Sequence, residues 1–279
     1  MIQKIQQINK QDLSWFIGFF VGDGYATRGR IGIDTTSPDN AKRIIKILRQ
    51  LSEKVKIEVY GSPDKFSSLL PNNYLLYQKK KVQHSDHIKI RIDDTKFQKT
   101  FLGIKENYIQ RVPVELVGDF LQGFFDAEAT VSPIGQIEID LSKSNKPIMQ
   151  LIGKLLSELE VEHKIKEHKS RLRLEISGTS RNVPNLMKFQ EFVNFYDGRK
   201  RAELENMIQI YSNPRNNGQE IESQVLAYIK ENPSTDLKTL MTVLKIKYDF
   251  LRRSINLLIK DGKIEKFELN KRRCFKIVS

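Results

Sequence analysis

Two similar apolar segments of the chain each end with an acidic residue followed by a small one. The first segment, WFIGFFVGDG, covers residues 15–24 and contains Asp23; the second, FLQGFFDAEA, covers residues 120–129 and contains Glu128, 105 positions later (128 − 23). Two carboxylates at the C-terminal ends of neighbouring helices repel each other and the negative end of the helix dipole. A hard divalent cation removes both penalties. The pair therefore predicts a Mg²⁺ or Mn²⁺ site; as the alternative, Asp23 only marks a turn from helix to strand.

The two segments must pack closely for their acids to meet. Gly18 and Gly22 are four positions apart, as are Gly123 and Ala127, so each predicted helix carries small residues on one face. Small residues allow two helix backbones to approach each other. We expect the backbone of Gly22 and Ala127 at the metal site. The aromatic side chains should fill the two cores beside it: Phe16, Phe19, Phe20, Phe124 and Phe125.

The residues after each acid repeat as well. An alternating segment typical of a strand, IGID in the first copy and IEID in the second, precedes a helical apolar period with Ser or Asn and Pro near its start. Two further alternating segments and a helix-like stretch then follow in both copies. The sequence thus gives the order helix, two strands, helix, two strands, helix twice.

Both motifs and this order of elements resemble the single-chain LAGLIDADG endonucleases, which carry two copies of a nine-residue motif. The resemblance covers roughly residues 10–212, with residues 16–24 and Leu121–Ala129 as the two copies. It implies an α+β fold of two pseudo-symmetric αββαββα half-domains, residues 1–108 and 109–212, whose β-sheets form a saddle over double-stranded DNA. It also implies a monomer that cleaves both DNA strands with a divalent metal.

The resemblance further implies a water-ordering Lys and Gln near the end of the second strand of each half. In the second half this place holds Ser142 and Lys143, and Lys143 is the candidate for polarising phosphate or water. In the first half Thr35 or Thr36 stands there, which leaves the extent of cleavage open. As alternatives, Ser142 begins a helix cap and Lys143 is a solvated charge. Asp126, which has no acidic counterpart in the first copy, should make polar contacts rather than bind a shared metal.

Composition favours a polyanionic partner. The chain has 47 Lys and Arg against 34 Asp and Glu, a net charge of +13 and a pI near 9.6. A basic protein with no such partner is the alternative. The apolar runs are shorter than the roughly twenty residues that a membrane span needs, so we expect no membrane association. A single cysteine, Cys274, and a polar N-terminus without a secretory signal predict an intracellular protein, cytoplasmic or nucleoid-associated and not secreted.

Basic residues recur at outward-facing positions of the predicted strands. Lys89 and Arg91 are two positions apart, as are Arg171 and Arg173, so each pair shares one face of its sheet. Ordinary solvated strand faces are the alternative interpretation. Together with these four, we expect further basic residues of the first half to contact DNA: Arg28, Arg30, Lys79, Lys80 and Lys81.

The C-terminal part has a composition of its own. Residues 213–219 are rich in Pro, Gly and Asn and predict a linker. Residues 220–279 predict three helices and a terminal hairpin, an arrangement that resembles a winged helix-turn-helix. Its third helix would enter the major groove and its wing would contact phosphates, with these candidates: Lys247, Tyr248, Arg252, Arg253, Asn256, Arg272 and Arg273. The alternative is a module for protein–protein contact.

Three functional interpretations follow. The paired acids, the repeat and the charge favour a site-specific, divalent-metal-dependent DNA endonuclease with an additional C-terminal DNA-binding module. The second interpretation is a non-cleaving DNA-binding regulator, which the missing Lys or Gln of the first half supports. A known regulator family joins a LAGLIDADG domain to a helix-turn-helix, but it typically lacks the metal-binding acids, and both are present here. The third is a maturase that binds intron RNA.

Overall fold

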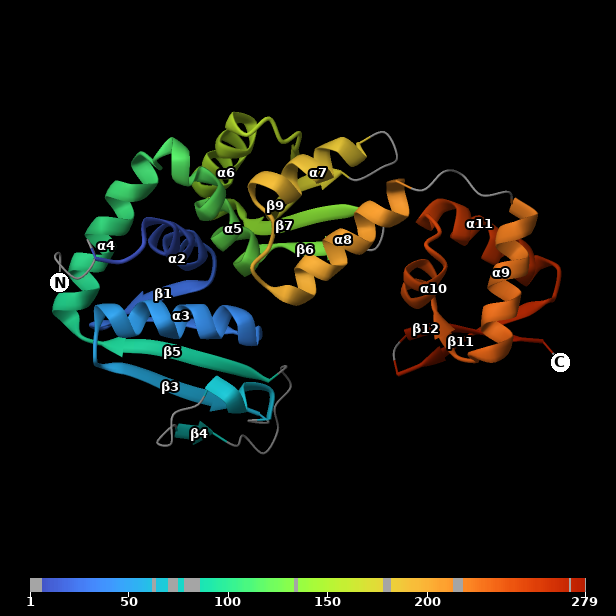
Figure 1. Cartoon of the computed structure of the whole chain (residues 1–279), viewed down its shortest axis with the longest axis horizontal. Coiled ribbons are helices and arrows are strands. Elements are labelled where there is room, and N and C mark those ends of the chain that lie inside the picture. Colours follow the sequence, from blue (N-terminus) through green and yellow to red (C-terminus); the bar gives the residue numbers. More distant parts are fainter. Residues whose placement is uncertain are drawn as a thin grey trace. The chain divides into compact units, whose positions relative to one another are not determined.

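The computed structural model describes residues 7–61, 64–69, 75–77, 86–132, 135–177, 182–212, 218–270 and 272–278. Its contacts divide the chain into two compact units. The first unit consists of Met1–Thr130, Ile139–Leu174 and Lys188–Arg201. The second unit consists of Val131–Glu138, Glu175–Met187 and Ala202–Ser279. The mixture of helices and strands confirms the expected α+β class (Figure 1). In the described ranges, every helix is too short or too polar to cross a membrane.

The two motif helices, α2 (Lys10–Asp23) and α5 (Val117–Glu128), pack directly against each other. A methyl group on Gly123 would lie 2.8 Å from the carbonyl carbon of Trp15 and 2.9 Å from the backbone nitrogen of Phe19. Only a residue without a side chain fits between these backbones. The close packing that the small residues predict is therefore confirmed.

The aromatic residues of both motifs are buried in the cores, as expected. In the first half, the ring of Phe20 lies 4.9 Å from that of Phe101, which belongs to helix α4 (Thr95–Gln110). In the second half, the ring of Phe125 lies 5.0 Å from that of Phe189. Each motif helix thus has a close-packed face toward the other motif helix and an aromatic contact within its own half.

The first sheet has the strand order β1-β2-β5-β3-β4. Its strands are β1 (Gly24–Thr27), β2 (Arg30–Thr35), β3 (Val55–Tyr60), β4 (Leu75–Tyr77) and β5 (His87–Asp93). Helix α3 (Pro38–Leu51) lies across one face of this sheet (Figure 1). Isoleucines alternate along β5 and are buried on this face, so the polar residues between them point to the other face. Strand β4 is an addition to the repeat that the sequence predicts.

The second sheet repeats the arrangement with the strand order β6-β7-β9-β8. Its strands are β6 (Thr130–Ser132), β7 (Gln136–Ser142), β8 (Lys164–Glu167) and β9 (Arg171–Ser177). Three helices belong to this half: α6 (Lys146–Glu158), α7 (Val183–Phe192) and α8 (Gly198–Ser212). The order helix, two strands, helix, two strands, helix therefore recurs, and α8 extends it.

The C-terminal residues form three helices and a small sheet. The helices are α9 (Gly218–Glu231), α10 (Leu237–Leu244) and α11 (Tyr248–Lys260), and the sheet order is β10-β12-β11. Its strands are β10 (Thr235–Asp236), β11 (Ile264–Leu269) and β12 (Arg272–Ile277). Lys245, in the turn between α10 and α11, has a left-handed backbone with φ 54°. The three helices and the hairpin match the sequence expectation, whereas the short β10 was not expected.

Candidate functional site

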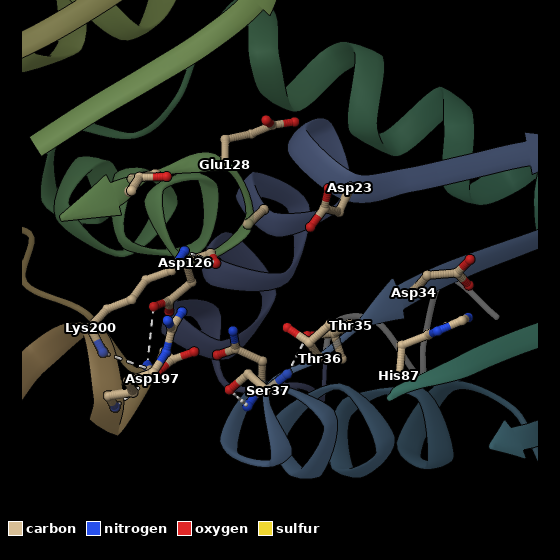
Figure 2. Close-up of a pocket in the computed structure, with 15 residues that line it drawn as sticks. Asp23, Asp34, Thr35, Thr36, Ser37, His87, Asp126, Glu128, Asp197 and Lys200 are labelled. Carbon is tan, nitrogen blue, oxygen red and sulfur yellow. Dashed lines mark hydrogen bonds between the residues drawn. The ribbon is translucent and has the colours of Figure 1, made fainter. Parts of the chain in front are cut away.

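Asp23 and Glu128 line one pocket of about 490 Å³, where α2 and α5 end (Figure 2). Helix α2 ends at Asp23 because the backbone becomes extended at Gly24, and α5 ends at Glu128 because it becomes extended at Ala129. A methyl group on Gly22 would come within 2.9 Å of the Cγ atom of Glu128. The small residue at this position therefore leaves room for the Glu128 side chain.

The surroundings make it costly for both acids to be ionised at once. Desolvation in the pocket, and then the charge of Glu128, raise the pKa of Asp23 to about 7. Desolvation also raises the pKa of Glu128. The Asp23 side chain nevertheless remains open to solvent, so water screens part of this repulsion. An added cation would stabilise the doubly ionised pair.

A buried lysine supplies part of the compensating charge. Lys200, at the start of α8, is 7% exposed, and its Nζ donates to the carbonyl oxygens of Phe125 at 3.1 Å and Asp126 at 2.6 Å. These carbonyls belong to the last turn of α5, where the helix dipole is negative. The positive charge of Lys200 lowers the pKa of both Asp23 and Glu128. Burial lowers the pKa of Lys200 itself, while Asp126 opposes this shift.

Sequence reasoning missed Lys200. The stretch DGRKRAEL carries three basic residues at a predicted helix start, which is typical of a solvated helix. No local pattern distinguishes the one lysine that turns inward.

Asp126 is a buried structural carboxylate. It is 3% exposed, and it accepts hydrogen bonds from Trp15 Nε1 at 2.9 Å and from the backbone nitrogens of Tyr196 and Asp197 at 3.1 Å. Burial raises its pKa to about 6. Its expected role in polar contacts is confirmed.

The rest of the pocket wall comes from both halves. The first half contributes the end of β2 and the start of α3, including Asp34 and the predicted Thr36; the second contributes Asp197 and Arg199 (Figure 2). Of the described residues, five with acidic and two with basic side chains line the pocket: Asp23, Asp34, Asp126, Glu128, Asp197, Arg199 and Lys200. Negative charge is thus concentrated here in a chain of net charge +13.

Ser142 and Lys143 are not among the residues that line this pocket. Lys143 instead forms an ion pair with Glu167, with Nζ 2.6 Å from Oε1, and the hydroxyl of Ser142 shares a hydrogen bond with that of Ser144. The chain turns at the end of β7 into a short 3₁₀ helix, Lys143–Asn145, and the ion-pair partner of the lysine, Glu167, lies on β8. Among the described residues, the lysine that lines the pocket with the acids is Lys200.

The donor set suits a hard divalent cation. The available ligands are the carboxylates of Asp23 and Glu128 and backbone carbonyls, and oxygen ligands of this kind bind Mg²⁺ and Mn²⁺. Among the described residues, no three His, Cys, Asp or Glu side chains converge closely enough to hold a metal. A cation bound here would therefore complete its shell with water or substrate oxygens.

Most of the predicted strand cations have a carboxylate partner. The Nε atom of Arg30 lies 3.6 Å from Oδ1 of Asp93, and Arg91 forms ion pairs with both Glu58 and Asp93. In the first half, the side chain of Arg28 is exposed in the tight turn between β1 and β2 with φ 45°. Arg171 is exposed in the second half. Lys79, Lys80 and Lys81 lie outside the described residues.

One ion pair is repeated between the two halves. Lys89 stands opposite Asp34 in the register of β5 and β2, with Nζ 3.5 Å from Oδ2. In the second half, the guanidinium of Arg173 donates to both oxygens of Asp140, at 2.9 and 2.8 Å. The two aspartates are the last residues of IGID and IEID, and the two basic residues are the third residues of HIKIRID and RLRLEIS. The internal repeat thus extends from the fold to a specific charge pair.

The predicted contacts of the C-terminal module fall into two groups. Arg252, Arg253 and Asn256 are exposed along α11, whereas Lys247 and Tyr248 are half-buried at its start. Arg272 and Arg273 are exposed at the start of β12, and a guanidinium nitrogen of Arg272 lies 3.7 Å from an oxygen of Asp236.

Comparisons with known proteins point to one domain type. A sequence model of the LAGLIDADG-like domain matches residues 115–189, a range that includes Glu128. A search of curated proteins finds no match. Among solved structures, I-DmoI in complex with DNA and Mn is 18% identical, covering 66% of this chain and 97% of that chain at a TM-score of 0.46. Full-length DUF199/WhiA from Thermatoga maritima is 17% identical, covering 93% of this chain and 95% of that chain at a TM-score of 0.49.

Proposed function

We propose that this protein is a divalent-metal-dependent endonuclease that cleaves double-stranded DNA at a specific site. The observation that carries the proposal is the placement of Asp23 and Glu128, which end two closely packed helices and line one pocket. The LAGLIDADG-like domain match around the second acid supports it. The net charge of +13 supports a polyanionic substrate.

Several residues of the pocket would have a role in this chemistry. Asp23 and Glu128 would hold Mg²⁺ or Mn²⁺ near the backbone of Gly22 and Ala127. The metal, when bound, supplies charge relief on the phosphate and an activated water. The positive charge of Lys200 opposes the upward pKa shift of both acids and so favours the ionised forms that would bind a metal. Thr36 also lines the pocket, and its hydroxyl would help to orient water.

The remaining parts of the chain would bind DNA. We assign residues 1–108 and 109–212 to two half-domains whose sheets form a saddle. The linker expected at residues 213–219 is shortened to residues 213–217, because helix α9 already begins at Gly218. We assign residues 220–279 to a winged helix-turn-helix, and its order of helices and strands supports this. The exposed side chains of α11 would read the major groove, and those at the start of β12 would contact phosphates. The protein would act as a monomer.

A non-cleaving DNA-binding regulator is the second candidate function. Neither Ser142 nor Lys143 lines the pocket, and the first half contributes Thr36 where the family's pattern has Lys or Gln. Both observations favour weak or absent catalysis with DNA binding retained. The third candidate, a maturase, would prefer folded RNA to duplex DNA.

Cleavage of a mixed DNA library in Mg²⁺ or Mn²⁺, followed by mapping of the breaks, tests the proposal. We expect the wild-type protein to cut at a defined sequence. Asp23→Asn and Glu128→Gln should abolish cutting and retain DNA binding, and the control Glu158→Gln, on the surface of α6, should cut normally. Binding of duplex DNA by the wild-type protein without any metal-dependent break would select the regulator. Stronger competition by intron RNA than by duplex DNA would select the maturase.

A further inference from the structure

The segment that carries Lys200 is tied to α5 at both ends. The buried carboxylate of Asp126 accepts from the backbone nitrogens of Tyr196 and Asp197, just before α8. The carboxylate of Asp197 accepts from the backbone nitrogens of Arg199 at 2.9 Å and Lys200 at 3.1 Å, and so caps the first turn of α8. The Nζ of Lys200 then returns to the carbonyl of Asp126. The segment from Tyr196 to Lys200 is thus hydrogen-bonded to Asp126 of the second motif twice, through its carboxylate and through its backbone carbonyl.

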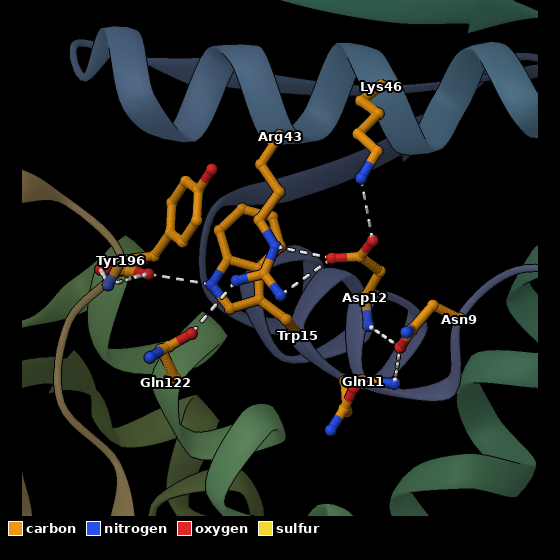
Figure 3. A network of polar contacts seen from close by, with 9 residues as sticks. Asn9, Gln11, Asp12, Trp15, Arg43, Lys46, Gln122 and Tyr196 are labelled. Atoms are coloured by element: carbon orange, nitrogen blue, oxygen red, sulfur yellow. Dashed lines mark hydrogen bonds and ion pairs between the residues drawn. The ribbon is translucent and has the colours of Figure 1, made fainter.

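Arg43 fixes the same segment to the first half. Its guanidinium carbon lies 4.4 Å from the ring centre of Trp15 and 4.6 Å from that of Tyr196 (Figure 3). Its Nε donates to Asp12 at 3.0 Å and its Nη1 to Gln122 at 3.1 Å. The guanidinium therefore lies against two rings that also contact each other, with ring centres 5.7 Å apart, and it has two polar partners. In such a partly dry environment cation–π contacts are strong.

The two arrangements meet at Trp15. Its ring packs under Arg43, and its Nε1 donates to the carboxylate of Asp126 at 2.9 Å. A second link joins the halves nearby, because the backbone nitrogen of Gly198 donates to Asp39 on α3 at 2.9 Å. The orientation of the 196–200 segment is thus determined jointly by α2, α3 and α5.

We propose that Arg43 and Asp126 are positioning residues, which hold the 196–200 segment so that Lys200 stays against the end of α5 beside Asp23 and Glu128. The inference rests on the proposed function, because Lys200 matters to catalysis only if the two acids do. Its physical basis is that a buried ammonium on a long flexible stem needs fixed partners to keep one geometry. Within the part of the chain that the structure describes, Lys200 is the one lysine that lines the pocket.

Arg43→Gln tests the proposal, with Lys46→Gln as the matched control. Both side chains come from α3 and form an ion pair with Asp12. Lys46 differs in that its side chain is 67% exposed, its Nζ lies 3.6 Å from Oδ2 of Asp12, and it is not one of the partners of the two rings described above. Trp15 is the sole tryptophan of the chain and is fully buried, so its fluorescence reports directly on this arrangement. We expect a red-shifted emission in Arg43→Gln and wild-type emission in Lys46→Gln.

The position of Lys200 is measured without any reference to cleavage. Lys200 is 7% exposed, so acetic anhydride should modify it slowly in the native protein, which mass spectrometry quantifies. We expect Arg43→Gln to speed this modification about tenfold through local opening, and Lys46→Gln to leave it unchanged. Unchanged protection of Lys200 in Arg43→Gln would overturn the proposal.

A double-mutant cycle then separates positioning from a general structural role. In single-turnover cleavage, Asp126→Asn and Lys200→Met should each slow the reaction by about tenfold to a hundredfold with DNA affinity retained. The double variant should be no slower than Lys200→Met, because Asp126 acts through Lys200. Additive losses would overturn the proposal. Suppose that the wild-type protein cuts no DNA, while Lys200 becomes more reactive in Arg43→Gln and not in Lys46→Gln. In that case the nuclease proposal fails and the positioning role stands.

Discussion

Replacing Gly123 by alanine should separate the two motif helices. The added methyl group would overlap the carbonyl group of Trp15 and lie 2.8 Å from its carbonyl carbon and 2.9 Å from the nitrogen of Phe19. Ordinary contacts between carbon atoms are about 3.5–4.0 Å, so the backbones must move apart by about 1 Å. Backbone atoms on both sides cannot rotate away as a side chain could.

The size of the effect follows from this displacement. Overpacking of a tight core costs about 1–3 kcal/mol, and here it acts on the contact that brings Asp23 and Glu128 together. A misplacement of about 1 Å at a reacting centre costs about a hundredfold in rate. We therefore expect Gly123→Ala to lose stability and, in the proposed nuclease, cleavage as well.

Urea unfolding followed by Trp15 fluorescence measures the stability of this part of the chain, because Trp15 is the sole tryptophan and lies on α2. Gly103→Ala is the matched control, since it is also a helical glycine, but beyond its own stretch of helix no described atom lies within 4 Å of the added methyl group. Alanine is the better helix former by about 0.5–1 kcal/mol, so the control should be slightly more stable. If Gly123→Ala unfolds at the same urea concentration as Gly103→Ala, the close-packing argument is wrong.

Three further results are expected. The pKa of Asp23 is about 7, and a metal must displace its proton. Mn²⁺ affinity measured by calorimetry should therefore rise with pH up to about pH 7 and then level off. Glu128→Gln should abolish Mn²⁺ binding, and a wild-type affinity that does not change with pH would contradict this assignment. Asp140→Asn removes one carboxylate that pairs with Arg173 and one negative charge from this sheet, so the salt dependence of DNA binding, measured by fluorescence anisotropy, should steepen by about one counterion. Arg252→Ala, on the exposed side of α11, should weaken DNA binding at every salt concentration, and an unchanged affinity would indicate that the C-terminal module binds a protein.

The sequence alone determined the helix pair and its acids. The four-residue spacing of Gly18 and Gly22, repeated in the second motif, is a local pattern that defines a helix face whatever the rest of the chain does. Alternating isoleucines likewise define which face of β5 is buried. These features depend on neighbours in sequence, and for that reason the repeat of elements could be predicted.

Only the tertiary structure decided which lysine lies beside the acids. Lys143 stands at the place that the family pattern indicates, yet it is not among the residues that line the pocket, and it pairs with Glu167 on β8. Lys200 turns inward because Asp197 caps its helix and Asp126 binds the segment before it. Both outcomes depend on side chains far apart in sequence, because electrostatic and hydrogen-bonding partners are chosen by proximity in space, which no local pattern of residues encodes.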